Sequence, residues 1–120
     1  MSGTTTLELP RRAGSASIAR LIVTAHGAAL SSERLRSANL MISELVSNAC
    51  QHGIGRIELC VHSNPDGVRA AVQDEGSGQS IASPDPRPER GGWGLQFVEQ
   101  LADTWGVEDD ASRVWFTVAA

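Results

Sequence analysis

Hydrophobic residues recur at helical spacing in two stretches of the N-terminal half of the chain. In residues 15–30 they follow Ser15 and Ser17, which we expect to act as N-caps. A second periodic stretch follows Ser31 and Ser32 and ends at Gly53, a residue type that commonly stops helices. The apolar positions are Ile18, Leu21, Ile22, Ala25 and Ala29, then Leu35, Ala38, Ile42, Leu45 and Ala49. The pattern therefore predicts two amphipathic helices.

The hydrophobic period changes from helical to alternating after residue 56. Apolar and polar residues alternate over 57–61 and again over 68–72, and the Asn-Pro-Asp-Gly sequence at 64–67 is a strong turn signal. This pattern predicts a β-hairpin. Residues 75–92 are rich in Gly, Ser and Pro and predict a long loop. The other expected elements are an edge strand at Leu7 and Leu9, a third helix marked by Leu95, Val98, Leu101, Ala102 and Trp105, and a last strand marked by Val114, Phe116 and Val118.

The order of these elements favours an α+β fold. A strand, two helices, a hairpin, a loop, a helix and a strand suit helices packed on one face of a mostly antiparallel sheet, a two-layer α/β sandwich. A doubly wound dinucleotide fold would instead alternate strands and helices. With 120 residues, 41% of them hydrophobic, the chain fits a single domain over residues 1–120. We expect residues 1–6 to form a flexible end.

The charge balance argues against direct nucleic-acid binding. The net charge is −4, and all ten basic residues are arginines scattered along the chain. Residues 1–13 lack the apolar core of a signal peptide or membrane span, so we expect a cytoplasmic protein without membrane attachment. Cys50 and Cys60 lack CxxC spacing, and the three histidines lack ligand spacing such as HExxH. Neither a redox pair nor a transition-metal site is predicted.

Three polar residues share one face of the second predicted helix. Glu44 and Asn48 are four residues apart, and Gln51 falls on the same stripe, opposite the apolar one. Amide and carboxylate oxygens are hard ligands that suit Mg²⁺, and a carboxylate on a rigid helix can orient a nucleophile. An isolated Glu and Asn at this spacing is more often an ordinary solvated face, so the pair needs support from other motifs.

Asp74 directly follows the second hairpin strand and shares the parity of its inward-facing residues. A carboxylate buried there needs a hydrogen-bond donor, which the amino group of adenine would supply. The competing interpretation is that Asp74 only caps the turn at residues 75–78. Both interpretations stay open at this point.

A glycine-rich stretch at residues 91–95 leads directly into the third predicted helix. Glycines there let backbone N–H groups approach an anion at the positive end of the helix dipole. The stretch is neither a Walker A loop nor a dinucleotide fingerprint, because the GxxxxGK pattern and a third spaced glycine are absent. It predicts either a phosphate cradle or a flexible joint.

Together these three elements have the order and placement typical of the GHKL superfamily of ATPases. The sequence ELVSNACQHG at 44–53 resembles its N box, DEGSG at 74–78 its first glycine box, and GWGL at 92–95 its second. The resemblance extends from Ser15 to Val118 and implies the Bergerat ATP-binding fold. The short form and the Glu-x-x-x-Asn-Ala-x-x-His-Gly version of the N box are similar to anti-sigma factors that phosphorylate a serine or threonine of an antagonist protein.

The resemblance implies a role for each matching residue. Glu44 would be the catalytic base or orienting group for the attacking hydroxyl, and Asn48 would bind the Mg²⁺ that bridges the phosphates of ATP. Asp74 would accept a hydrogen bond from adenine. His52 either approaches the phosphates or only finishes the helix, and residues 79–91 would form the lid. The remaining nucleotide-binding positions are Gly76 and Gly78 beside the base and ribose, and the backbone of Gly92, Gly94 and Leu95 along the phosphates.

The implied function is that of an anti-sigma-factor-type regulator with serine/threonine kinase activity. It would use Mg-ATP to phosphorylate an anti-anti-sigma (antagonist) protein and would sequester a sigma factor or similar regulator, either as a monomer or as a homodimer. The alternative is a nucleotide-gated protein-binding module without kinase activity. Intact Glu44 and Asn48 favour the kinase, whereas the short lid with Pro84, Pro86 and Pro88 favours the binding module. The catalytic domain of a sensor histidine kinase is disfavoured, because the sequence before Ser15 is too short for a histidine-bearing pair of dimerisation helices.

Overall fold

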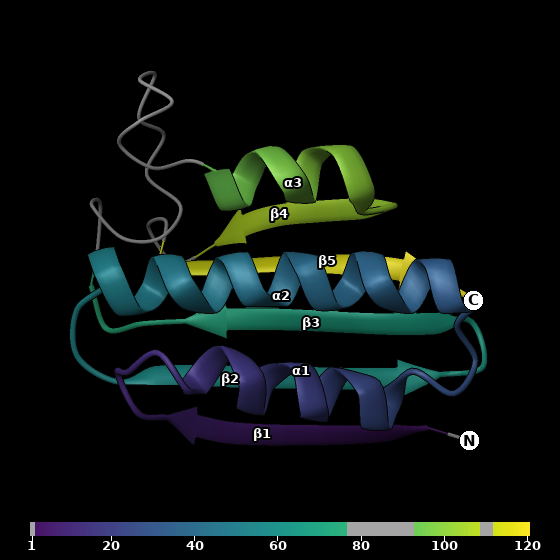
Figure 1. Ribbon diagram of the computed structural model, residues 1–120, viewed down its shortest axis with the longest axis horizontal. Coiled ribbons are helices and arrows are strands. Elements are labelled where there is room, and N and C mark those ends of the chain that lie inside the picture. Colours follow the sequence, from purple (N-terminus) through teal and green to yellow (C-terminus); the bar gives the residue numbers. More distant parts are fainter. Residues whose placement is uncertain (1, 77–92, 109–111) are drawn as a thin grey trace.

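The computed structural model describes residues 2–76, 93–108 and 112–120 (Figure 1). Within these ranges the chain forms three helices and five strands. Their bounds are β1 (Gly3–Leu9), α1 (Ser15–His26), α2 (Ser32–His52), β2 (Ile57–Asn64), β3 (Gly67–Gln73), α3 (Trp93–Leu101), β4 (Thr104–Glu108) and β5 (Arg113–Ala119). None of the helices in the described ranges combines the length and the apolar character that crossing a membrane requires.

The five strands form one sheet in the order β1-β2-β3-β5-β4, and every neighbouring pair is antiparallel. All three helices lie on one face of this sheet: α1 covers β1 and β2, α2 runs across β3 and β5, and α3 lies beside α2 over β4 (Figure 1). The predicted α+β fold with two layers is therefore confirmed.

The core fills the space between the helices and the inward face of the sheet. Ile57, Leu59 and Val61 alternate along β2 and are fully buried, and Phe116 and Met41 are the largest fully buried side chains. The outward residues between them are polar or partly exposed, as expected for an antiparallel sheet with one solvated face. This layer pattern fixes which side chains at the strand ends face the helices.

The first helix is shorter than predicted and is capped differently. It ends at His26, and its C-cap is Gly27, where an added Cβ would lie 2.7 Å from Leu35 Cδ1. Its N-cap is Gly14, and Ser15 is a buried helical residue whose hydroxyl donates to the carbonyl of Pro10. The expected capping roles of Ser15 and Ser17 are therefore wrong.

The third helix also ends earlier than predicted. It stops at Leu101, and Trp105 lies in β4 opposite Phe116 of β5. This strand was not predicted, because Trp105 falls at helical spacing from Leu101 and Gly106 weakens the strand signal. Gly106 has a packing role, since an added Cβ would lie 2.7 Å from Nε1 of Trp115.

The N-terminal strand begins earlier than expected. Gly3 already pairs with Ser63, so residues 3–6 belong to β1 and not to a flexible end. Three consecutive threonines at 4–6 supply the β-branched side chains that favour a strand at the sheet edge. The expectation of a flexible N-terminus does not hold for these residues.

Candidate functional site

The long helix α2 is the rigid element that carries the predicted polar face. Ser31 caps it by accepting a hydrogen bond from the Arg34 N–H at 3.1 Å, and the N–H of its C-cap residue Gly53 donates to Ala49. The predicted stop at Gly53 is confirmed, and the helix begins one residue earlier than predicted, at Ser32. Glu44 is half-buried and Asn48 is buried, one turn closer to the C-terminal end. The helix thus holds both side chains on one face at fixed spacing.

Asn48 is buried and has an amide nitrogen with no partner in the described part of the chain. The residue is 8% exposed, and its Nδ2 atom makes no hydrogen bond there. An unpaired buried polar atom is costly, so such positions commonly contact a ligand, an ion or water. Because an amide can turn about its last torsion, the same position can present the oxygen to a cation.

Asp74 is the buried acid that the alternation of β3 predicts. It is 4% exposed, and its backbone N–H donates to the carbonyl of Ser112 at 3.0 Å. Its Oδ1 accepts from the Gly76 N–H at 2.8 Å, which is the turn-capping contact of the competing interpretation. Its Oδ2 has no partner among the described residues. Capping therefore accounts for one carboxylate oxygen and leaves the other available.

The acid at the end of β3 lies directly against the end of α2. A Cβ added at Gly53 would overlap Asp74 Oδ2 and would lie 2.6 Å from the carbonyl oxygen of Ala49. Since Ala49 follows Asn48, the unpaired oxygen of Asp74 lies at the same end of α2 as the predicted Mg²⁺ ligand. Two of the three predicted motifs are thus brought together, and glycine at position 53 is what permits the approach.

Other predicted residues are placed less completely. Gly94 and Leu95 lie in the first turn of α3, and Leu95 packs against the core. His52 is the last residue of α2 and is exposed, so its role stays a prediction. Gly78, Gly92 and the proposed lid at 79–91 lie outside the described residues.

A family model shows to which protein family the chain belongs. The model of the histidine kinase-like ATPase domain matches residues 9–118, nearly the whole chain. The chain belongs to this family. Membership implies that this histidine kinase-like ATPase domain binds ATP, a nucleotide that such domains usually hold with Mg²⁺.

The same fold occurs in a solved structure of low sequence identity. The domain is similar to the crystal structure of the RsbU and RsbW domains of Rv1364c from Mycobacterium tuberculosis, with a TM-score of 0.66 and 21% identity. The match covers 98% of this chain and 32% of the chain in that structure, so this chain spans about a third of the length of that chain. At this identity the likeness shows the fold. No curated protein matches the chain significantly.

The described residues of this ATPase domain fit an adenine nucleotide. The unpaired Oδ2 of Asp74 is an acceptor suited to the exocyclic amino group of adenine, and Asn48 adds an unpaired amide at the same end of α2. The helix α3 packs beside α2, and backbone N–H groups in the first turn of a helix are donors that favour anions. These polar groups therefore suit a polar ligand such as a nucleotide rather than an apolar one.

Two features beside the site were missed by sequence reasoning. Ile54 is 58% exposed, and its Cβ and Cδ1 would both lie 3.3 Å from a Cβ added at Gly76, so it forms an apolar neighbour of the first glycine box. Arg11 contacts the C-terminal carbonyls of α2 from the connection between β1 and α1. A single exposed Ile and a single loop Arg have no spacing signal, and only the fold brings them to the site.

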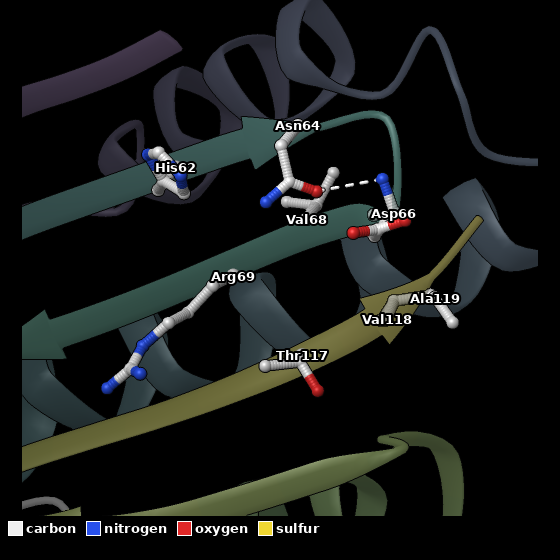
Figure 2. Close-up of a pocket in the computed structure, with 9 residues that line it drawn as sticks. His62, Asn64, Asp66, Val68, Arg69, Thr117, Val118 and Ala119 are labelled. Atoms are coloured by element: carbon white, nitrogen blue, oxygen red, sulfur yellow. Dashed lines mark hydrogen bonds between the residues drawn. The ribbon is translucent and has the colours of Figure 1, made fainter. Parts of the chain in front are cut away.

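Figure 2 shows a separate pocket at the other end of β3. It is lined by nine residues around the β2–β3 turn, where Asn64 Oδ1 accepts from the Asp66 N–H at 2.8 Å. None of the site residues predicted from the sequence lines it. Since β3 is seven residues long, the pocket and Asp74 lie about 20 Å apart along the strand. This pocket is therefore distinct from the candidate nucleotide site.

Proposed function

We propose that this domain is an ATP-dependent protein serine/threonine kinase of the anti-sigma-factor type. The observation that carries the proposal is the buried carboxylate of Asp74, which has one capped and one unpaired oxygen and lies against the end of the helix that holds Glu44 and Asn48. Turn capping alone does not explain why Asp74 is buried with one oxygen unpaired. An adenine amino group at Oδ2 would remove that cost.

Each residue has a proposed role in binding. Asp74 accepts a hydrogen bond from the adenine amino group, and Asn48 binds Mg²⁺ through its amide oxygen. His52 lies at the end of α2, where it would approach the phosphates. The backbone positions proposed to line the nucleotide are Gly76, Gly78, Gly92, Gly94 and Leu95. These assignments follow the motif resemblance and agree with the placement of the residues that the structure describes.

Glu44 is the proposed catalytic residue for transfer. It lies one helical turn from Asn48, so its carboxylate would orient a serine or threonine hydroxyl of a partner protein and accept its proton. The hydroxyl oxygen would then bond to the γ-phosphorus as the bond from that phosphorus to ADP breaks. The chemistry that Mg²⁺ supplies when bound is neutralisation of phosphate charge.

The proposed partners are a sigma factor or similar regulator and an antagonist protein that receives the phosphoryl group. The resemblance of residues 44–53 to the N box of anti-sigma kinases supports this partner class. The likeness to a structure that contains an RsbW domain is consistent with it. A cytoplasmic location follows from these partners.

Two variants test whether Asp74 acts in ATP binding and Glu44 in phosphoryl transfer. Glu44→Gln should keep the affinity for ATP within about twofold and lower phosphoryl transfer by about 100-fold or more, because it removes the proton acceptor. Asp74→Asn should lower the affinity for ATP by about tenfold, because it weakens a hydrogen bond to a buried charged group. Calorimetry measures binding, and labelled ATP with a purified candidate antagonist protein measures transfer.

Glu33→Gln is the matched control for Glu44→Gln, because Glu33 is an exposed acid in the first turn of the same helix. It should change neither quantity. Equal loss of ATP binding in the Glu44 and Asp74 variants would contradict the proposed roles. A wild-type protein that binds no ATP would refute the proposed function.

A nucleotide-gated protein-binding module is the second candidate function. The observation that favours it is that the Glu44 side chain makes no hydrogen bond or ion pair within the described ranges, whereas Asp74 is held at two atoms. A base that nothing orients is a poor catalyst. The transfer assay separates the two: ATP-dependent capture of the partner without labelling would support the binding module.

A further inference from the structure

An arginine outside the three ATPase motifs holds the end of α2. Arg11 lies in the connection between β1 and α1, and its Nη1 donates to the carbonyls of Ala49 and, at 3.1 Å, of Cys50. Its Nη2 donates to the carbonyl of Gly55 at 2.6 Å. One guanidinium thus bridges the last turn of the helix and the loop that follows it.

The chemistry of a helix terminus explains why an arginine suits this position. The last carbonyls of a helix carry partial negative charge and mostly lack intrahelical partners, and a carbonyl oxygen can accept two hydrogen bonds. The Ala49 carbonyl accepts from both the Gly53 N–H and Arg11. A planar guanidinium presents several N–H groups in fixed directions, so it can satisfy carbonyls on two segments at once, which the single ammonium of a lysine does less well. Arg11 therefore fixes the loop relative to the helix.

That loop, residues 53–56, supports the proposed adenine-binding acid. Gly53 lies against Asp74 Oδ2, and the carbonyl of Ile54 accepts from the Glu75 N–H at 2.8 Å. The Glu75 side chain completes the connection, because its Oε2 accepts from the Arg56 N–H at 2.6 Å. The loop is thus hydrogen-bonded on one side to Arg11 and on the other to the residue after Asp74.

We propose that Arg11 is a positioning residue for adenine recognition. It holds the loop at 53–56 in the one position that leaves Asp74 Oδ2 facing the base, although Arg11 itself does not contact the nucleotide. This inference rests on the proposed ATP-binding function. It adds the connection between β1 and α1 to the parts of the chain that determine nucleotide selectivity.

The first test compares ATP with inosine triphosphate, in which a carbonyl replaces the adenine amino group. The dissociation constant of inosine triphosphate divided by that of ATP measures the contribution of the Asp74 contact, because a loss of overall stability affects both constants equally. Arg11→Gln should reduce this ratio by about tenfold, the effect of one misplaced hydrogen bond. Arg11→Lys should give an intermediate ratio, because it keeps the charge and loses the two-segment contact.

Arg12→Gln is the matched control. Arg12 is the adjacent residue, has the same charge and exposure, and makes none of the three guanidinium contacts. It should leave the ratio unchanged. A wild-type ratio in Arg11→Gln, or an equal fall in Arg12→Gln, would overturn the positioning role.

The second test needs no nucleotide. Amide hydrogen exchange in the free protein should be about tenfold faster at Glu75 and Arg56 in Arg11→Gln than in wild type, because their N–H groups are held through the loop. Unchanged exchange there would refute the positioning role even if wild type bound no ATP. Wild-type protein that binds neither triphosphate, with faster exchange in the variant, would refute the ATP-binding function and with it the role in adenine recognition, and would leave Arg11 as a support of the loop alone.

Discussion

The two ends of the proposed nucleotide site are built differently. At the base end, Asp74 is held at its backbone N–H and at Oδ1, and Gly53 lies against its other oxygen. At the phosphate end, Glu44 and Asn48 project from α2, and neither the Glu44 carboxylate nor Asn48 Nδ2 has a partner within the described ranges. The fold therefore fixes the acid that we propose for base recognition, whereas the side chains at the proposed phosphate end are not fixed by contacts within those ranges.

This difference indicates which substitutions should change the affinity for the base and which should change the contacts with the phosphates and Mg²⁺. Where the fold holds a binding group in place, moving the residues that hold it lowers the affinity for the ligand, because binding must then order that group. Replacing a side chain without protein partners removes only the contact that this side chain makes with the ligand or the metal ion. Perturbing each end separately should therefore give distinct nucleotide and metal dependences.

The largest expected effect is at Gly53, where α2 meets Asp74. Gly53→Ala should lower ATP affinity by about 100-fold, because the added Cβ must displace either the buried carboxylate or the Ala49 carbonyl, and such overpacking costs about 1–3 kcal/mol. Calorimetric titration with Mg-ATP measures the change. Gly14→Ala is the control, since an added Cβ there meets nothing within 4 Å. Wild-type affinity in Gly53→Ala would show that the base end is not preorganised.

A smaller and metal-dependent effect is expected at the phosphate end. Asn48→Ala should lower ATP affinity by about tenfold in Mg²⁺, the scale of lost metal contacts, and leave affinity unchanged in a chelator. Titrations under both conditions measure the difference. Asn39→Ala is the control, because Asn39 lies on α2 nine residues earlier and contacts Thr24. An equal loss with and without Mg²⁺ would assign Asn48 to the base end.

Much of this arrangement could be predicted from the sequence, because its local parts carry local signals. The stripe of α2 and the parity of Asp74 follow from periodicity, and the stop at Gly53 follows from its residue type; the fold confirms each of them. The support of Asp74 could not be predicted. Gly53 is 21 positions from Asp74, and Arg11 is farther still, so only the packing of α2 over β3 brings them together. The strand β4 was missed for a different reason, since Trp105 matches a helical and a strand pattern equally well.

The smallest expected effect concerns the apolar side of the base end. Ile54 is 58% exposed beside Gly76, so covering it with a purine would bury roughly half of an isoleucine side chain, worth about fivefold in affinity. Ile54→Ser should therefore weaken ATP and inosine triphosphate equally, because an apolar contact does not distinguish the amino group from a carbonyl. Leu21→Ser is the control, since Leu21 is 70% exposed on α1. Loss confined to ATP would mean that Ile54 acts through Asp74, and no loss would place the base away from Gly76.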